Sequence, residues 1–283
     1  MSASKSQNPA KSIEQIVGVF DCVSARIASK YDFDWLHIGG YNLSASSLGY
    51  PDVGLLTLSE NVERVRRITP HCSKRVLVDG DDGYGNHLNV IRLVKEMQSA
   101  GANAMHLEDQ VLPKKCGHMD GKRIVPTERF VDKIKAFVDT RTSSDFLLFA
   151  RTDTLALNGY NDAVERANRY IEAGADVIFV EALVETSHIE KLPHDVRAPL
   201  LYNWVFGGKS PLVHPDKLSQ LGYSHLLQAD VLYAVAPALE RYFEQLKNTG
   251  TYGEASSQMI DFSQFNELVG YSDIERLDQT YGS

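Results

Sequence analysis

The chain has 283 residues, 43% of them hydrophobic and 23% charged, an ordinary globular composition that excludes a disordered or collagen-like chain. Its formal net charge is −8, so we expect no nucleic-acid binding through a basic face. Its three cysteines are too few for a disulfide framework. Residues 1–12 are polar and lack the apolar core of a signal peptide, and no apolar run approaches the length of a membrane span. We expect a cytoplasmic protein whose residues 1–12 are flexible.

Short apolar segments recur along the chain and predict buried strands. Each is three to five residues long and mostly apolar on both faces, as the strands of parallel sheets are. The segments cover residues 16–20, 35–38, 75–78, 104–107, 146–150, 177–180, 200–202 and 225–227.

Helix-like stretches separate these segments. Thr57 and Glu60 have the spacing of a capping box, at the start of a helix that carries Val62, Val65 and Ile68. The other expected helices cover residues 88–97, 128–138, 162–172, 215–221 and 231–246. The alternation of strands and helices predicts an α/β fold, a single-domain (β/α)8 TIM-type barrel, with an open doubly wound sheet as the alternative.

The end of the chain exceeds what a barrel of roughly 250 residues needs. Residues from about 250 to 283 predict a helical extension, with short helices over 263–269 and 274–281. We expect this extension to pack on a neighbouring subunit, so that the protein is a homo-oligomer.

Polar residues follow most of the predicted strands. In a barrel, the C-terminal ends of the strands carry the catalytic candidates. Asp79, Asp81 and Glu108 would converge there, and clustered carboxylates repel one another unless a cation is present. Oxygen ligands of this kind suit Mg²⁺, or alternatively Mn²⁺. The competing interpretation is that these side chains only cap helices and turns.

Residues 113–122 form a polar loop with an unusual composition. Lys114 and Lys115 precede Cys116, and His118 follows it, which predicts a lowered pKa for the thiol. Glycines in the loop would let it move. The competing interpretation is a solvated basic loop with an idle cysteine.

Two further polar residues lie at strand ends. Arg151 ends an apolar strand, where an unpaired charge is costly, so it needs a carboxylate partner from the protein or from a ligand. His106 is expected to be a core histidine.

Together these residues resemble the isocitrate lyase/phosphoenolpyruvate mutase superfamily over nearly the whole chain. The most specific piece is Lys114-Lys-Cys-Gly-His118, which follows Glu108-Asp-Gln110 and is similar to the loop of the carbon–carbon lyase branch. That branch includes 2-alkylmalate and methylisocitrate lyases, and the carboxyphosphonoenolpyruvate mutases are similar. Residues 46–52, 79–85 and 150–153 also match.

The resemblance implies a (β/α)8 barrel whose last helix is exchanged between subunits, in dimers that pair into tetramers. It implies Mg²⁺ held by Asp79 and Asp81, with Glu108 completing the shell. It implies that Cys116 protonates a carbanion, that Lys114 and His118 support it on a gating loop, and that Glu181 lies near the substrate. The residues that it implies for substrate binding are His37, Gly39, Gly40, Tyr41, Asp52, Gly117, Arg151 and Asn203.

The implied activity is Mg²⁺-dependent cleavage of a carbon–carbon bond in a small anionic di- or tricarboxylate. Candidate substrates are 2-alkylmalates, methylisocitrate-like acids and oxaloacetate. The chain departs from most relatives near the substrate, with Gly39 in place of a hydroxyl residue and Phe206 in place of a glutamate. His37 and residues 41–46 favour an alternative, C–P bond chemistry on a phosphonopyruvate or carboxyphosphonoenolpyruvate-type substrate. A non-catalytic binding protein is a third possibility.

Overall fold

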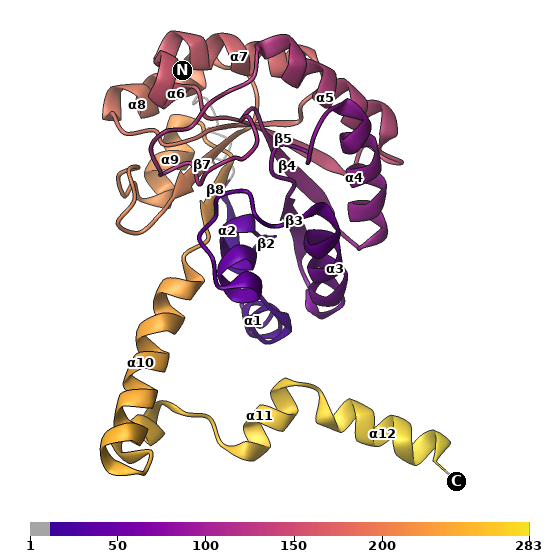
Figure 1. Ribbon diagram of the computed structural model, residues 1–283, viewed down its shortest axis with the longest axis vertical. Coiled ribbons are helices and arrows are strands. Elements are labelled where there is room, and N and C mark those ends of the chain that lie inside the picture. Colours follow the sequence, from indigo (N-terminus) through magenta and orange to yellow (C-terminus); the bar gives the residue numbers. More distant parts are fainter. Residues whose placement is uncertain (1–11, 283) are drawn as a thin grey trace, which may run out of the picture.

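The predicted strands, which are apolar on both faces, form one closed barrel. A computed structural model describes residues 12–282 and contains a closed sheet of parallel strands in chain order, with β8 pairing back to β1 (Figure 1). The strands are β1 (Glu14–Val19), β2 (Trp35–Ile38), β3 (Arg75–Asp79), β4 (Ala104–Glu108), β5 (Leu147–Thr152), β6 (Val177–Val180), β7 (Leu200–Trp204) and β8 (His225–Gln228). The predicted (β/α)8 fold class is confirmed, and the open sheet is excluded.

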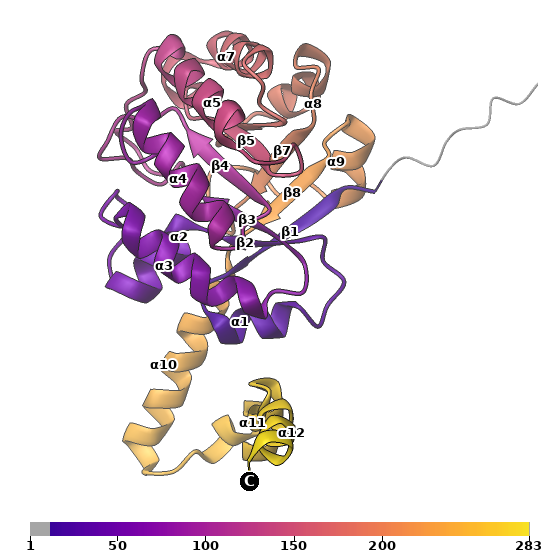
Figure 2. The ribbon, with the colours of Figure 1, turned by 90° about the vertical axis from the view of Figure 1, so that its right-hand side faces the viewer.

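Helices surround this barrel, as Figures 1 and 2 show. They are α1 (Cys22–Ala28), α2 (Gly40–Leu43), α3 (Leu58–Ile68), α4 (His87–Ser99), α5 (Thr127–Thr140), α6 (Leu155–Asn158), α7 (Tyr160–Glu172), α8 (Thr186–Asp195) and α9 (Pro215–Leu221). Short π or 3₁₀ turns occur at Ser44–Leu48, Thr69–His71 and Gly253–Gln258. The predicted flexible segment 1–12 lies, apart from Ser12, outside the described residues.

The core has two layers. Side chains such as Ile16, Trp35 and Phe149 fill the barrel interior, and a larger apolar cluster joins the outer face of the strands to the helices. The capping box at α3 is confirmed, because Glu60 Oε2 accepts from the Thr57 N–H at 2.9 Å. Burial of apolar surface in both layers fixes the positions of the strand ends.

Several strands run further than the apolar segments that predict them. β4 reaches Glu108, β5 includes Arg151, and β7 includes Asn203. Glu108 and Arg151 are direct neighbours in the register of β4 and β5. Glu108, Arg151 and Asn203 therefore lie on the strands themselves, whereas other residues of the candidate site, such as Cys116, lie on the loops that follow.

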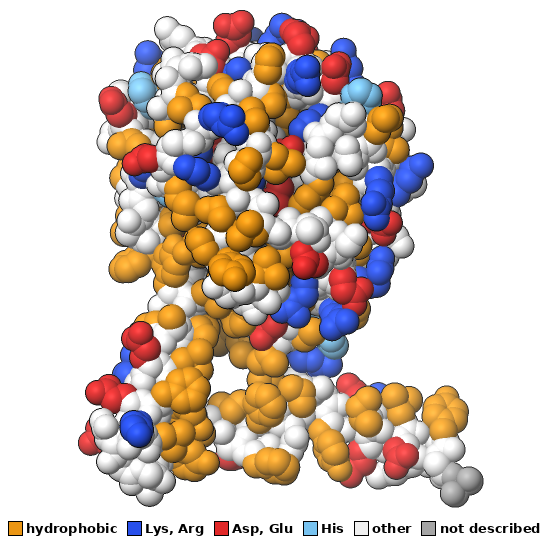
Figure 3. All heavy atoms as spheres, in the orientation of Figure 1, with side chains coloured by type: hydrophobic (Ala, Val, Ile, Leu, Met, Phe, Trp, Pro, Cys, Tyr) orange, Lys and Arg blue, Asp and Glu red, His pale blue; other side chains and the backbone are white. Residues whose placement is uncertain are grey.

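The C-terminal part of the chain leaves the barrel as an arm, which comprises α10 (Val231–Thr249), α11 (Phe262–Leu268) and α12 (Tyr271–Tyr281). A helix over 231–246 was expected among the helices that alternate with the strands. The helix forms, but it projects away from the barrel and none of its residues is buried (Figures 1 and 2). Figure 3 shows apolar side chains along the inner side of this arm. Over the described range, no helix is long and apolar enough to cross a membrane.

Candidate active site

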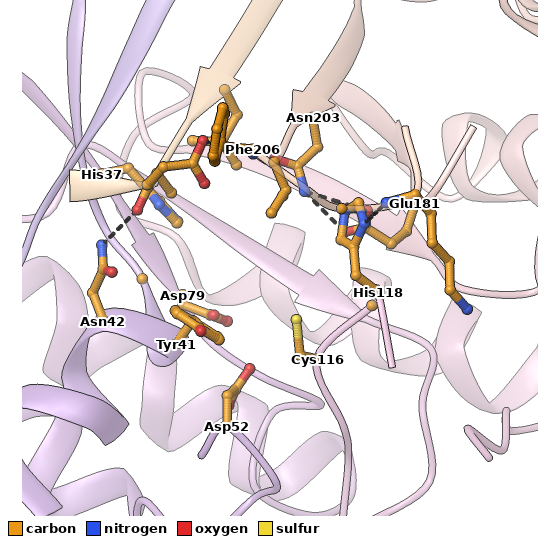
Figure 4. Close-up of a pocket in the computed structure, with 18 of the residues that line it drawn as sticks. His37, Tyr41, Asn42, Asp52, Asp79, Cys116, His118, Glu181, Asn203 and Phe206 are labelled. Carbon is orange, nitrogen blue, oxygen red and sulfur yellow. Dashed lines mark hydrogen bonds and ion pairs between the residues drawn. The ribbon is translucent and has the colours of Figure 1, made fainter. Parts of the chain in front are cut away.

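A cavity of about 360 Å³ opens at the C-terminal ends of the strands (Figure 4). Its size lies at the lower end of the range for small-molecule sites. Most of the predicted site residues line it, namely His37, Gly39, Tyr41, Asp52, Asp79, Cys116, Gly117, His118, Arg151, Glu181 and Asn203. Gly40, Asp81, Glu108 and Lys114 do not line it, but each is buried and contacts residues that do.

Lys114 is the cation of the acidic cluster beside the cavity. Its Nζ lies 2.6 Å from Asp81 Oδ1 and 2.8 Å from Asp52 Oδ1. Burial opposes ionisation of Asp79, but His106 and Lys114 beside it hold the pKa of this carboxyl well below its usual value. Burial raises the pKa of Asp81 to about 7, although Lys114 acts in the opposite direction. The charge of Lys114 is therefore engaged by carboxylates.

The predicted ligands fit a hard cation in their chemistry. Both carboxylate oxygens of Glu108 are buried without a hydrogen bond among the described residues, and the nearest charge is Arg151 Nη1, 3.3 Å from Oε2. Anionic oxygen donors of this kind suit Mg²⁺. Within residues 12–282, however, no three His, Cys, Asp or Glu side chains are gathered closely enough to hold an ion. In this structure Lys114 pairs with Asp81 and Asp52 of the cluster.

Arg151 finds its carboxylate partner within the protein. Its Nε and Nη2 atoms donate to Asp153 at 2.9 and 3.0 Å, a two-pronged pairing that fixes the plane of the guanidinium. Its Nη1 lies 3.3 Å from Glu108 and 3.4 Å from Glu181. The guanidinium thus joins three carboxylates at the wall of the cavity, where it can also bind an anionic substrate.

Glu181 is held by side chains from three segments of the chain, and Figure 4 shows two of them, His118 and Asn203, pointing toward it. Asn203 Nδ2 donates to both of its oxygens at 3.2 Å. His118 Nδ1 accepts from the Lys209 N–H at 2.8 Å, and its Nε2 lies 3.1 Å from Glu181 Oε1. Burial opposes ionisation, but Arg151 and His118 hold the pKa of Glu181 well below its usual value. Glu181 is therefore an ionised carboxylate.

Cys116 lies on the loop over the cavity (Figure 4). Burial raises the pKa of its thiol to about 11. The predicted lowering of this pKa is wrong, because carboxylates engage Lys114 and Lys115 donates to a carbonyl of its own loop. A thiol with so high a pKa keeps its proton at neutral pH, which suits a proton donor.

His37 and His106 form a buried pair in the cavity wall. Their Nε2 atoms lie 3.0 Å apart, and His106 Nδ1 is 3.5 Å from Asp79 Oδ1. Burial lowers the pKa of His37 to about 3 and also lowers the pKa of His106. A Cβ at Gly39 would come within 2.6 Å of His37 Cε1, so this ring position requires glycine at 39. His106 is buried as expected, but it also lines the cavity.

The loop that carries Cys116 lies directly on the charged wall. A Cβ at Gly117 would come within 2.2 Å of Glu181 Cγ and 2.5 Å of Arg151 Nη2, so only glycine allows this approach. The Cys116 N–H donates to the Asp52 carbonyl at 3.0 Å, which ties the other side of the loop to the cavity rim. The loop is therefore closed over the cavity.

Sequence reasoning missed several residues that build the site. Lys122 and Asp153 form an ion pair at 3.0 Å. In the sequence, Lys122 is noticeable only as the last residue of the loop 113–122, and Asp153 only as the last residue of the segment 150–153. Residues 205–209 and the start of α10 also line the cavity. Asp230 Oδ2 accepts from the Phe206 N–H at 3.0 Å, a contact between distant segments that no local pattern reveals.

Comparison with known proteins supports the resemblance. A sequence model described as phosphoenolpyruvate phosphomutase matches residues 8–247. The 2,3-dimethylmalate lyase of Eubacterium barkeri is 40% identical over 267 residues, covering 94% of this chain and 92% of the relative. The petal death protein of Dianthus caryophyllus is 44% identical over 256 residues, with 89% and 80% coverage.

Solved structures agree with this result. An oxaloacetate acetylhydrolase in complex with the inhibitor 3,3-difluorooxalacetate has a TM-score of 0.91 and 30% identity, covering 96% of this chain and 93% of that one. A phosphonopyruvate hydrolase in complex with oxalate and Mg²⁺ has a TM-score of 0.86 and 25% identity, with coverage of 96% and 95%. The prediction of a lyase-type enzyme is confirmed, and the chain belongs to the phosphoenolpyruvate phosphomutase family within the isocitrate lyase/phosphoenolpyruvate mutase superfamily.

Proposed function

We propose that this enzyme is a Mg²⁺-dependent lyase that cleaves a carbon–carbon bond in a 2-hydroxy or 2-oxo dicarboxylate. In a 2-hydroxy acid the hydroxyl gives up its proton as the carbon–carbon bond breaks, with the ionised Glu181 in the cavity lining as the acceptor, which leaves a 2-oxo acid and an enolate-like carbanion. In oxaloacetate one bound water adds to the 2-oxo carbon before the bond breaks. Cys116 protonates the carbanion. The observation that carries the proposal is the Cys116 thiol, whose raised pKa of about 11 keeps it protonated on a loop closed over the cavity. The similarity to the 2,3-dimethylmalate lyase of Eubacterium barkeri supports it.

The charged wall accounts for binding of the substrate. Arg151 is the cation that lines the cavity from β5, so we assign it to a carboxylate of the substrate, with Asn203 beside it. Asp79, Asp81 and Glu108 would hold Mg²⁺, which supplies charge stabilisation for a developing enolate oxygen. Closure of the loop excludes water, which would otherwise compete to protonate the carbanion.

The cavity is less well suited to a third carboxylate. Apart from Arg151, its lining includes Val205, Phe206 and Tyr233, and its lysine, Lys209, is paired with Asp120 at 2.6 Å. We therefore favour a dicarboxylate with an alkyl substituent, or oxaloacetate, over a methylisocitrate-like tricarboxylate.

The test is a proton and phosphorus NMR screen of the purified protein with Mg²⁺ and a matched chelator control. The panel contains oxaloacetate, 2-methylmalate, 2,3-dimethylmalate, methylisocitrate, isocitrate and phosphonopyruvate. Chelator-sensitive release of a 2-oxo acid from a malate, or of oxalate and acetate from oxaloacetate, is the expected result. Absence of turnover on every carboxylate would overturn the proposal.

A second candidate is C–P bond chemistry on the same enolate platform. The buried His37 in the cavity wall and the structural similarity to a phosphonopyruvate hydrolase favour it. Turnover of phosphonopyruvate alone in the same screen would select this candidate. If no compound reacts, the non-catalytic interpretation takes its place.

We also propose that the arm packs on a second copy of this chain. Ile274, Leu277 and Tyr281 on α12 are half or more exposed, with fractions of 63%, 49% and 81%. An apolar groove of about 610 Å³ lies between α1 and the start of α10, where the arm leaves the barrel. The arm of a partner is the occupant that we assign to this groove, in a dimer or tetramer, and the mass in solution tests it.

These assignments complete a picture of one barrel domain over residues 1–283, with residues from about 250 onward as a helical extension. We place the enzyme in the cytoplasm, because its cysteines at 22, 72 and 116 are all free thiols, as expected in a reducing compartment.

A further inference from the structure

Lys122 is a buried lysine to which neither the metal nor the substrate assignment gives a role. Its side chain is 2% exposed, although it belongs to the polar loop of residues 113–122. Its Nζ donates to the carbonyl oxygen of Gly117, five residues earlier in the same loop. The same ammonium lies 3.0 Å from Asp153 Oδ1, on the segment that follows β5. Lys122 therefore joins the loop to the barrel.

The two partners of Lys122, Gly117 and Asp153, each adjoin a residue of the candidate site. Gly117 lies between Cys116 and His118, so holding its carbonyl fixes the backbone that carries both side chains. Asp153 is fully buried and orients Arg151 through two hydrogen bonds. One ammonium thus connects the segment of the thiol to the carboxylate that orients the substrate-binding arginine.

Opening of the loop must break this connection. If Gly117 moves away, either its carbonyl loses the ammonium or Lys122 moves with the loop and leaves Asp153. Hydrogen bonds to charged groups are among the stronger ones, so this contact biases the loop toward its closed position. The other loop lysine that is free of the carboxylate cluster, Lys115, donates only to the exposed Asp120 carbonyl and has no such effect.

We propose that Lys122 is a positioning residue, a latch that holds the loop closed through Gly117 and Asp153 and so sets the position of Cys116. The inference rests on the proposed function for its catalytic meaning, since Cys116 is the proton donor there. The latch itself is a property of the folded chain, and its test needs no substrate.

The experiment measures the rate at which iodoacetamide alkylates each cysteine, by mass spectrometry of peptides. Lys122→Met should raise the rate at Cys116 about tenfold or more, because the loop opens more often. Cys22 and Cys72 lie far from the loop in the chain and serve as internal references, with unchanged rates. Lys115→Met, which removes one lysine from the same loop, is the matched control and should leave the Cys116 rate as in the wild type.

The loss of the positive charge of Lys122 cannot by itself make Cys116 react faster. Removing a nearby cation raises a thiol pKa and lowers its thiolate fraction, which slows alkylation. A faster reaction at Cys116 therefore reports access. Lys122→Arg, which keeps a cationic donor, should restore most of the protection.

An unchanged or slower Cys116 rate in Lys122→Met would overturn the latch. If all three cysteines react faster, the variant has unfolded, and Lys122→Gln takes its place, because it keeps a donor for Gly117 but no charge for Asp153. Faster alkylation of Cys116 alone then supports the latch, and a wild-type rate refutes it. Once a substrate is known, Lys122→Met should lower kcat more than Lys115→Met does.

The two proposals can fail separately. If the NMR panel shows no turnover but Cys116 is unmasked in Lys122→Met, the latch stands without the lyase. If a malate is cleaved and the Cys116 rate does not change, the lyase stands and Lys122 has only a structural role.

Discussion

The cavity wall and the C-terminal arm depart from the ordinary rule of burial in opposite directions. The wall and the acidic cluster beside it bury charges, with Arg151 and Lys114 at 7% and 2% exposure among carboxylates, whereas the arm exposes large apolar side chains such as Phe243 and Phe262. Buried charges require partners, and exposed apolar surface favours association. This contrast is the basis of our two proposals, a ligand for the wall and a second copy of the chain for the arm.

This comparison predicts that substitutions in the two regions have separable effects. Changes in the wall should affect turnover and the stability of the fold, while changes in the arm should affect the mass in solution. Five predictions test whether the effects are separable, in order of decreasing size.

Cys116→Ser should lower turnover by about 10²–10⁴-fold, the usual contribution of a general acid, because a serine hydroxyl is a poorer proton donor. Melting temperature and mass in solution should not change. The measurement is the initial rate on the substrate that the NMR screen identifies. Cys72→Ser, away from the cavity, is the control. Full turnover by Cys116→Ser would remove the thiol from the mechanism.

Arg151→Met should destabilise the protein by about 3–5 kcal/mol, because it leaves Glu108, Asp153 and Glu181 buried without their shared cation. Urea unfolding followed by circular dichroism measures this loss. Arg151→Lys should recover part of it, since the charge remains but the two-pronged pairing with Asp153 is lost. An unchanged free energy of unfolding in Arg151→Met would mean that the three carboxylates do not need this cation to remain buried.

The thiol pKa gives a prediction about pH. At pH 8 the thiolate fraction of Cys116, with a pKa of about 11, should be about 100-fold lower than that of a thiol with a pKa of 9. Cys116 keeps its proton below pH 11 and loses it as the pH rises through that value, so the alkaline limb of kcat should lie near 11. Alkylation rates of Cys116 and of free cysteine, compared across pH, measure the difference. An alkaline limb near pH 8 would contradict the assignment of burial as the dominant influence.

Ile274→Asp, on α12 of the arm, should weaken association by about 2 kcal/mol or more if the side chain is a central contact, and so shift the protein toward smaller species on dilution. Light scattering over a range of concentrations measures the shift. Asp273→Asn, a polar change at the adjacent position of the same helix, is the control. A mass equal to that of one chain in the unmodified protein would contradict packing of the arm on a second copy.

Thr57→Ala lies outside both regions and sets the scale of an ordinary local contact. Loss of the capping box at α3 should cost about 1 kcal/mol in urea unfolding. Turnover and mass should remain as in the wild type, and Ser59→Ala in the same helix turn should have a smaller effect.

The sequence predicts the barrel well because a strand that is buried on both faces is a short continuous apolar segment, which can be read from the sequence alone. Even the capping box of Thr57 and Glu60 is a local pattern and is recovered in full. The strand ends are underestimated, because Arg151 and Asn203 continue the ladder while interrupting the apolar run. The position of α10 is not predictable from its sequence, since an apolar helix face looks the same whether it covers its own barrel or another chain.

The candidate site is predicted as a set of residues but not as a set of pairings. Strand ends and the loop motif bring the right side chains to one cavity. The predicted direction of the pKa shift of Cys116 was wrong, because Lys114 and Lys115 are close to it in sequence but bind other groups in the folded chain. The pair of Lys122 and Asp153 spans 31 residues, so only the folded chain brings the two together.

Lys114 has a consequence for how the enzyme matures. Its ammonium stands between Asp52 and Asp81, so the acidic end of the barrel carries its own counter-ion. Many metalloproteins cannot fold until an ion neutralises the ligand set. If this enzyme binds Mg²⁺ as proposed, we expect the barrel to close first, so that folding and loading with the ion are separate events. Chelation of the finished enzyme should then leave a protein that is inactive but still folded.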